Sequence, residues 1–116
     1  MPKTGKRVGG NLKYIFMKLT IAVTYTDITG GKTDISIINK NTKNIIWNAN
    51  PSFPKSGLQS LDISSGPYIF TIDGNTSGSC KIVISLPNKI LYTNTFPGGN
   101  YSPILNITIP TDNTLP

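Results

Sequence analysis

The chain has 116 residues, with eleven lysines and arginines against five aspartates, and it contains neither histidine nor glutamate. This length suits one domain with a hydrophobic core of its own. With no histidine and a single cysteine, the chain lacks the side chains for a zinc site or a Ser-His-Asp triad.

The composition favours strands over helices. Seventeen isoleucines and fourteen threonines stand against two alanines. β-Branched residues favour strands, whereas alanine and glutamate favour helices. Nine prolines and eleven glycines punctuate the apolar segments. The sequence therefore predicts an all-β fold, and we expect a single antiparallel β-sandwich, Ig-like or jelly-roll-like, of about seven or eight strands.

The positive charge is concentrated near the N-terminus. Residues 1–26 carry five cations and no acid, whereas the other ninety residues carry six lysines and five aspartates. We therefore predict an extended basic arm over residues 1–13, a β-sandwich domain over residues 14–110 and a polar tail over residues 111–116. Such an arm can bind phosphate, anionic lipid or an acidic protein surface, or serve only as a solvated tail.

Residues 12–26 alternate at period two, which predicts a strand. Its inward face comprises Ile15, Met17, Leu19, Ile21, Val23 and Tyr25. The opposite face is apolar at Tyr14 and Phe16 but polar from Lys18 onward. An unbroken strand of this length would span roughly 50 Å, so we expect it to bend or to extend past its own domain. In the second case a partner would cover Tyr14 and Phe16.

Seven further strands are predicted from alternating apolar residues, at positions 33–39, 44–50, 58–63, 68–72, 79–86, 89–96 and 104–109. Segments rich in glycine, proline and asparagine predict the turns between them. Residues 50–57 contain two prolines and a glycine, which predicts a loop with Phe53 tucked into the core. The inward positions predict buried side chains at Trp47, Tyr68, Phe70, Ile72, Ile82, Ile84 and Ile107.

The segment LDISSGPYIFTI, residues 61–72, resembles the L-x-x-G-x-Y-x-F-x-I hairpin of immunoglobulin-like and transthyretin-like (carboxypeptidase-regulatory, CnaB-type) sandwich modules. Gly66 and Tyr68 match the glycine and tyrosine of that pattern. The resemblance implies a sandwich fold with a structural, adhesive or binding role and no catalytic activity. CnaB-type modules can also form a Lys–Asn isopeptide bond. Here Lys18 and Asn106 have suitable positions in the chain, but Lys18 falls on the polar face and glutamate is missing.

No catalytic, cofactor-binding or metal-binding residue is predicted, and we expect no enzymatic activity and no cofactor. The five aspartates, Asp27, Asp34, Asp62, Asp73 and Asp112, are predicted in or beside turns, where aspartate bonds the backbone. Residues 73–77 offer oxygen atoms for calcium but lack the ligand spacing of a known loop. Cys80 is predicted to be a buried, inert thiol, because no histidine can activate it. Trp47 is predicted in the core rather than in an aromatic sugar platform with Tyr92, Phe96 and Tyr101.

We therefore expect a non-enzymatic structural or interaction subunit of a larger assembly. A capsid, decoration or tail component of a phage or virus is the leading analogy. The predicted assembly arm includes Lys3, Lys6, Arg7, Lys13, Tyr14 and Phe16. The expected partners are other copies of the chain, other structural proteins, or nucleic acid bound through the arm. We expect no small-molecule substrate.

The expected location follows from the apolar segments. No apolar run approaches the roughly 20 residues of a membrane-spanning helix. The apolar run after the basic start is interrupted by Lys18 and lacks a small-residue cleavage site, so no Sec signal peptide is predicted. We expect the virion, or the host cytoplasm during assembly. The alternatives are a cell-surface or secreted carbohydrate-binding or adhesin module and a small nucleic-acid-binding β-barrel.

Overall fold

The computed structural model describes residues 16–27 and 31–111, apart from the side chains of residues 49–52. These residues form nine strands and no helix. The strands are β2 (Met17–Tyr25), β3 (Gly31–Asn39), β4 (Ile45–Phe53), β5 (Gly57–Ile63), β6 (Gly66–Thr76), β7 (Cys80–Leu86), β8 (Lys89–Phe96), β9 (Gly99–Tyr101) and β10 (Ile104–Ile109). The all-β prediction is confirmed.

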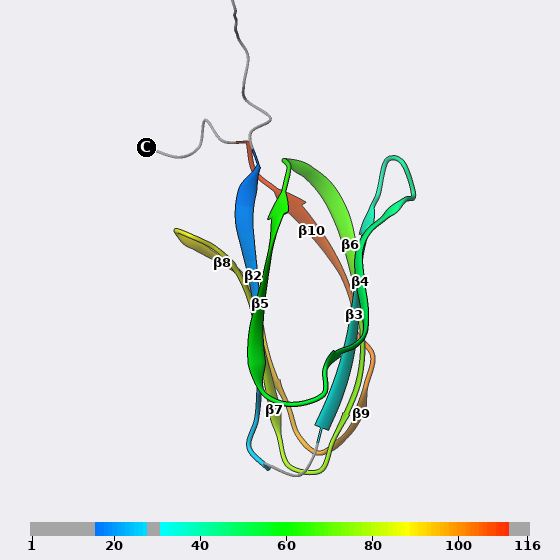
Figure 1. Cartoon of the computed structure of the whole chain (residues 1–116), viewed down its shortest axis with the longest axis vertical. Coiled ribbons are helices and arrows are strands. Elements are labelled where there is room, and N and C mark those ends of the chain that lie inside the picture. Colours follow the sequence, from blue (N-terminus) through cyan, green and yellow to red (C-terminus); the bar gives the residue numbers. More distant parts are fainter. Residues whose placement is uncertain (1–15, 28–30, 112–116) are drawn as a thin grey trace, which may run out of the picture.

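The strands form two antiparallel sheets. The four-stranded sheet has the order β5-β2-β7-β8. The five-stranded sheet has the order β10-β6-β3-β4, and β9 pairs with the end of β6 that β10 leaves uncovered. Figure 1 shows the two sheets on opposite sides of the molecule, and their inward side chains belong to one hydrophobic core.

Period-two alternation generates this core. In β2, every second residue from Met17 to Tyr25 is buried, and β3, β6 and β7 follow the same pattern. The predicted core positions Tyr68, Phe70, Ile72, Ile82, Ile84 and Ile107 are all buried. Trp47 is only partly buried against the core, so its prediction as a fully buried residue is wrong. The reason is that β4 lies at a sheet edge and its register with β3 shifts beside Trp47.

Two strands run further than the sequence predicts. Residues 73–76 belong to β6 rather than to a turn, because β3 pairs with them on one side and β9 on the other. Strand β4 continues through Pro51 to Phe53, which an edge strand tolerates. Its register with β3 shifts between Thr33 and Ile35, so the predicted loop is in part a bulged strand. Phe53 is buried, as predicted.

A chain of buried hydroxyl groups links the two sheets. The Tyr25 hydroxyl of β2 donates to the Phe53 carbonyl at 2.8 Å and lies 2.6 Å from Oγ1 of Thr33. Thr33 Oγ1 lies 2.8 Å from the Tyr101 hydroxyl. Because each hydroxyl carries one proton, Thr33 donates to Tyr25 and Tyr101 donates to Thr33. Every member of the chain is thus satisfied, which a buried polar group requires.

Burial raises the pKa of both Tyr25 and Tyr101 above the usual tyrosine value. In the unfolded chain both hydroxyls titrate near pH 10, whereas in the folded chain they keep their protons to higher pH. The stability that they contribute is therefore present at neutral pH. It should fall above about pH 10 by roughly 1.4 kcal/mol per pH unit for each tyrosine.

Urea denaturation between pH 8 and pH 11.5 measures this fall. The free energy of unfolding of the Tyr101→Phe variant should fall less steeply with pH than that of the wild-type chain. The reason is that of the two tyrosine hydroxyls with raised pKa only that of Tyr25 remains. An equal slope in both proteins would mean that Tyr101 titrates normally in the folded state.

Candidate interaction surface

The outer face of the five-stranded sheet carries a stripe of isoleucines. Ile38 of β3 stands opposite Ile69 of β6 and opposite Ile45 of β4. Ile104 of β10 stands opposite Thr71 of β6. Thr71 is the next residue after Ile69 on the outer face of β6, so Ile104 is a diagonal neighbour of Ile69. Ile45 is 58% exposed and Ile104 is 68% exposed, whereas Ile38 and Ile69 are half-buried. We call these four residues the isoleucine stripe.

The stripe differs from scattered surface isoleucines because its members are neighbours on four adjacent strands. Single exposed apolar residues are common on protein surfaces, but a contiguous apolar patch is typical of an interaction site. Apart from Ile46, which is 41% exposed on β4, the other isoleucines on these strands, such as Ile35, Ile37 and Ile72, are buried in the core. The five-stranded sheet is therefore apolar on both faces at this level.

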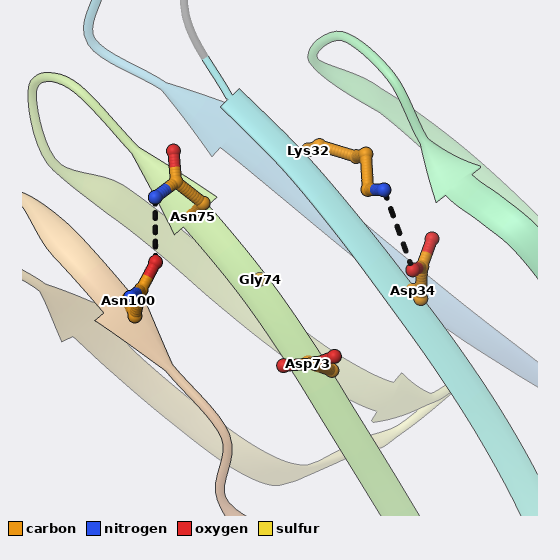
Figure 2. Close-up of a pocket in the computed structure, with 6 residues that line it drawn as sticks. All are labelled: Lys32, Asp34, Asp73, Gly74, Asn75 and Asn100. Atoms are coloured by element: carbon orange, nitrogen blue, oxygen red, sulfur yellow. Dashed lines mark hydrogen bonds and ion pairs between the residues drawn. The ribbon is translucent and has the colours of Figure 1, made fainter.

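Two aspartates face each other on the same outer surface. Asp34 of β3 stands directly opposite Asp73 of β6. Figure 2 shows the two side chains on their neighbouring strands. The prediction of Asp73 in a turn is wrong, because β3 and β6 pair over nine residue pairs that include it. Asp34 lies in β3, within the strand predicted over residues 33–39. Like charges directly opposite each other destabilise a sheet, so this carboxylate pair costs the fold some stability.

The carboxylate pair lines a shallow hollow of about 190 Å³. Its other lining residues are Lys32, Gly74, Asn75 and Asn100. Lys32 Nζ lies 3.9 Å from Asp34 Oδ2, and Lys32 is mostly exposed, so this ion pair is weak. Asn75 Nδ2 donates to Asn100 Oδ1 at 2.6 Å, which joins β6 to β9. Two carboxylates against one ammonium group leave the hollow negative.

The hollow presents charge rather than a metal cage. Within residues 16–27 and 31–111, no group of three or more histidine, cysteine, aspartate or glutamate side chains gathers as metal ligands would. The oxygen-bearing side chains of residues 73–77, considered above for calcium, also do not gather around one point. Thr76 is buried, and the Ser77 hydroxyl donates to Asp27 Oδ2 at 2.8 Å. Asp62 lies near the end of β5, within the strand predicted over residues 58–63 and beside the turn that follows it.

The aromatic and isopeptide alternatives find no support in the geometry. The ring of Tyr101 is buried and stacks on Phe96, with centroids 4.6 Å apart, whereas Trp47 lies on β4 at the far edge of the same sheet. These rings therefore form no open platform. Lys18 and Asn106 stand on exposed positions of different sheets, so a bond between them would have to cross the core.

The predicted assembly arm is described only at its end. Lys3, Lys6, Arg7, Lys13 and Tyr14 lie outside the described residues. Phe16 directly precedes β2, shares the outward parity of Lys18 and is 62% exposed. That a partner covers Phe16 stays a prediction.

Within the described ranges, no helix is long and apolar enough to cross a membrane. No protein-family model, no curated protein and no solved structure matches the chain. The function proposed below therefore follows from the sequence and the geometry of this chain alone.

Proposed function

We propose that this chain is a β-sandwich interaction module that acts as a non-enzymatic subunit of a larger assembly. The observation that carries the proposal is the isoleucine stripe, which crosses four strands of one sheet and is open to solvent at Ile45 and Ile104. An apolar sheet face without a deep apolar pocket suits association with another protein surface better than capture of a small molecule.

Burial of the stripe would supply a useful driving force. Moving one isoleucine side chain from water to an apolar contact contributes about 1.5–3 kcal/mol when it becomes fully buried. Ile45 and Ile104 are mostly exposed in the single chain, so a partner can gain most of this amount from each. The partner proposed here is a second copy of the chain.

The setting proposed for this assembly is a phage or viral particle, in which the chain would serve as a capsid, decoration or tail component. The support is an analogy of architecture: a small all-β domain, a basic N-terminal arm and an apolar outer face suit such a subunit. In this proposal the basic arm, with Lys3, Lys6, Arg7 and Lys13, provides contacts between subunits or with nucleic acid.

Substitution of the stripe tests the proposal. The double variant Ile45→Thr/Ile104→Thr keeps β-branched residues in both strands but removes most of the exposed apolar surface. We expect its self-association constant to fall at least tenfold, which corresponds to about 1.4 kcal/mol. Sedimentation velocity over a range of protein concentrations measures this change.

The matched control is Leu58→Thr/Ile90→Thr, which alters two equally exposed residues on the other sheet. This control should associate like the wild-type chain. The proposal is wrong if the stripe variant also associates like the wild type, or if the wild-type chain stays monomeric at every concentration tested.

A further inference from the structure

We propose that the basic arm of one copy docks on the outer face of the five-stranded sheet of a second copy. In this arrangement Lys3, Lys6 and Arg7 lie over the Asp34–Asp73 pair. The apolar side chains of Leu12 and Tyr14 lie against the isoleucine stripe. The inference rests on the proposed function, because it assumes that copies of the chain associate, and it specifies which surfaces meet.

Charge complementarity supports this pairing. Residues 1–13 contain Lys3, Lys6, Arg7 and Lys13 and no acid. The hollow on the sheet has two carboxylates and one ammonium group. Directly opposed residues on antiparallel strands have their Cβ atoms about 4.5–5.5 Å apart, so Asp34 and Asp73 repel each other. A cation placed over both carboxylates removes this repulsion, and a guanidinium group can bind carboxylate oxygens with two parallel hydrogen bonds.

The arm is long enough to reach both features of the sheet. Asp34 and Ile38 are four residues apart on β3, which corresponds to about 13 Å. Lys6 and Leu12 are six residues apart, which corresponds to at most about 20 Å in an extended chain. An arm that follows the surface can therefore place its cations over the carboxylates and its apolar residues on the stripe. Gly9 and Gly10 lie between the two parts and allow the backbone to adapt.

The same pattern favours a second copy over the arm's own sheet. The inward face of β2 continues upstream to Ile15, and residues 12–16 contain no glycine or proline, so the sequence predicts an extended segment that continues the direction of the strand. To reach its own five-stranded sheet, the chain would have to reverse direction within residues 13–15. Those residues are Lys13, Tyr14 and Ile15, none of which favours a turn. The glycines, Gly9 and Gly10, lie nearer the N-terminus.

The isoleucine stripe lies nearer the end of the sheet at which the arm is attached, and the carboxylate pair lies further along the sheet. Strand β2 begins beside Ile63 at the end of the molecule where β6 begins and β10 ends (Figure 1). The carboxylate pair lies toward the other end, where β3 begins and β6 ends. Two copies that exchange arms form a closed dimer, whereas one-way donation of the arm produces rings or open rows of subunits.

Charge reversal in full-length chains tests the inference. The acidic-arm variant carries Lys3→Glu, Lys6→Glu and Arg7→Glu, and the basic-face variant carries Asp34→Lys and Asp73→Lys. Each variant alone should associate at least tenfold more weakly than the wild-type chain at low salt. An equimolar mixture should regain association, because each arm then meets a face of opposite charge. Raising the salt concentration should weaken the regained association, because salt screens exposed charges.

Asp62→Lys is the matched control, because Asp62 is an exposed strand aspartate on the other sheet. It should associate like the wild type. If the basic-face variant unfolds at a lower temperature than the wild type, Asp34→Asn/Asp73→Asn replaces it. This second variant removes the acceptor charge without adding a new repulsion, and it should also weaken association at least tenfold.

The possible outcomes separate the inference from the proposed function. If the wild-type chain associates but the face variants associate equally well, or the mixture fails to recover, the arm does not dock on this face of a second copy. The isoleucine stripe can still mediate assembly in that case. Combining both reversals in one chain detects docking on the arm's own sheet. The inference is overturned if fluorophores on residue 4 and Ser102 lie closer together in this chain than in the acidic-arm variant while the chain stays monomeric. A wild-type chain that remains monomeric overturns both proposals.

Discussion

Replacement of Phe70 with alanine is expected to lower the free energy of unfolding by about 3–5 kcal/mol. Phe70 lies in the middle of β6 and is fully buried. Its register partners are Ile37 on β3 and Leu105 on β10, so paired strands hold the backbone on both sides. The surrounding side chains therefore cannot collapse far into the cavity, which places the expected cost in the upper range for a core substitution. Urea denaturation at neutral pH measures it.

The control for this substitution is Ile90→Ala, which truncates a side chain that is 63% exposed on the edge strand β8. Surface substitutions of this kind change stability by less than about 0.5 kcal/mol. A loss below about 1 kcal/mol for Phe70→Ala would contradict the assignment of Phe70 to the core.

The inward faces of the strands could be predicted from the sequence because period-two alternation is a local signal. In β2, polar or small residues separate the buried side chains, so the two faces are distinct without knowledge of the partner strands. The same signal located Cys80 and Ile107 in the core. It failed at Trp47, because whether a strand lies at the edge or in the centre of a sheet is set by distant pairing.

The extension of β6 could not be predicted for a related reason. Asp73, Gly74 and Asn75 are typical turn residues, and by local preference they end a strand. They remain in the sheet because Gly74 pairs with Thr33 on one side and with Tyr101 on the other. Those two partners lie forty-one residues before and twenty-seven residues after Gly74 in the sequence. No window of local sequence contains this information.

The candidate interaction surface was only partly accessible to prediction. The pairs Ile37–Ile38 and Ile45–Ile46 place apolar residues on both faces of a strand, which is a local sign of a strand covered on two sides. That Ile38 meets Ile69, and that Asp34 meets Asp73, follows from the register of β3 with β6. The charge of the arm was visible in the sequence, whereas the negative hollow proposed to receive it forms only when the two strands pair.

Replacement of Gly74 with alanine is expected to lower the free energy of unfolding by about 2–4 kcal/mol, although it adds only one methyl group. A Cβ atom at this position would overlap the ring and the hydroxyl of Tyr101, which lies across the strand pair. The ring has little room to move. It stacks on Phe96 at an interplanar angle of 12°, and its hydroxyl is held by Thr33 at 2.8 Å. Accommodation of the methyl group must therefore break the stack or the buried hydrogen bond.

Two comparisons isolate this mechanism in urea denaturation experiments. Gly57→Ala also adds a methyl group to a strand glycine, but there the nearest neighbouring atoms lie 3.9 Å and 4.0 Å away, so it should be close to neutral. In a Tyr101→Ala background the ring is gone, and Gly74→Ala should then cost less than about 0.5 kcal/mol, because a double-mutant cycle reports the interaction between the two sites. An equal cost with and without the Tyr101 ring would show that Gly74 is required for its backbone rather than for the space that it leaves to Tyr101.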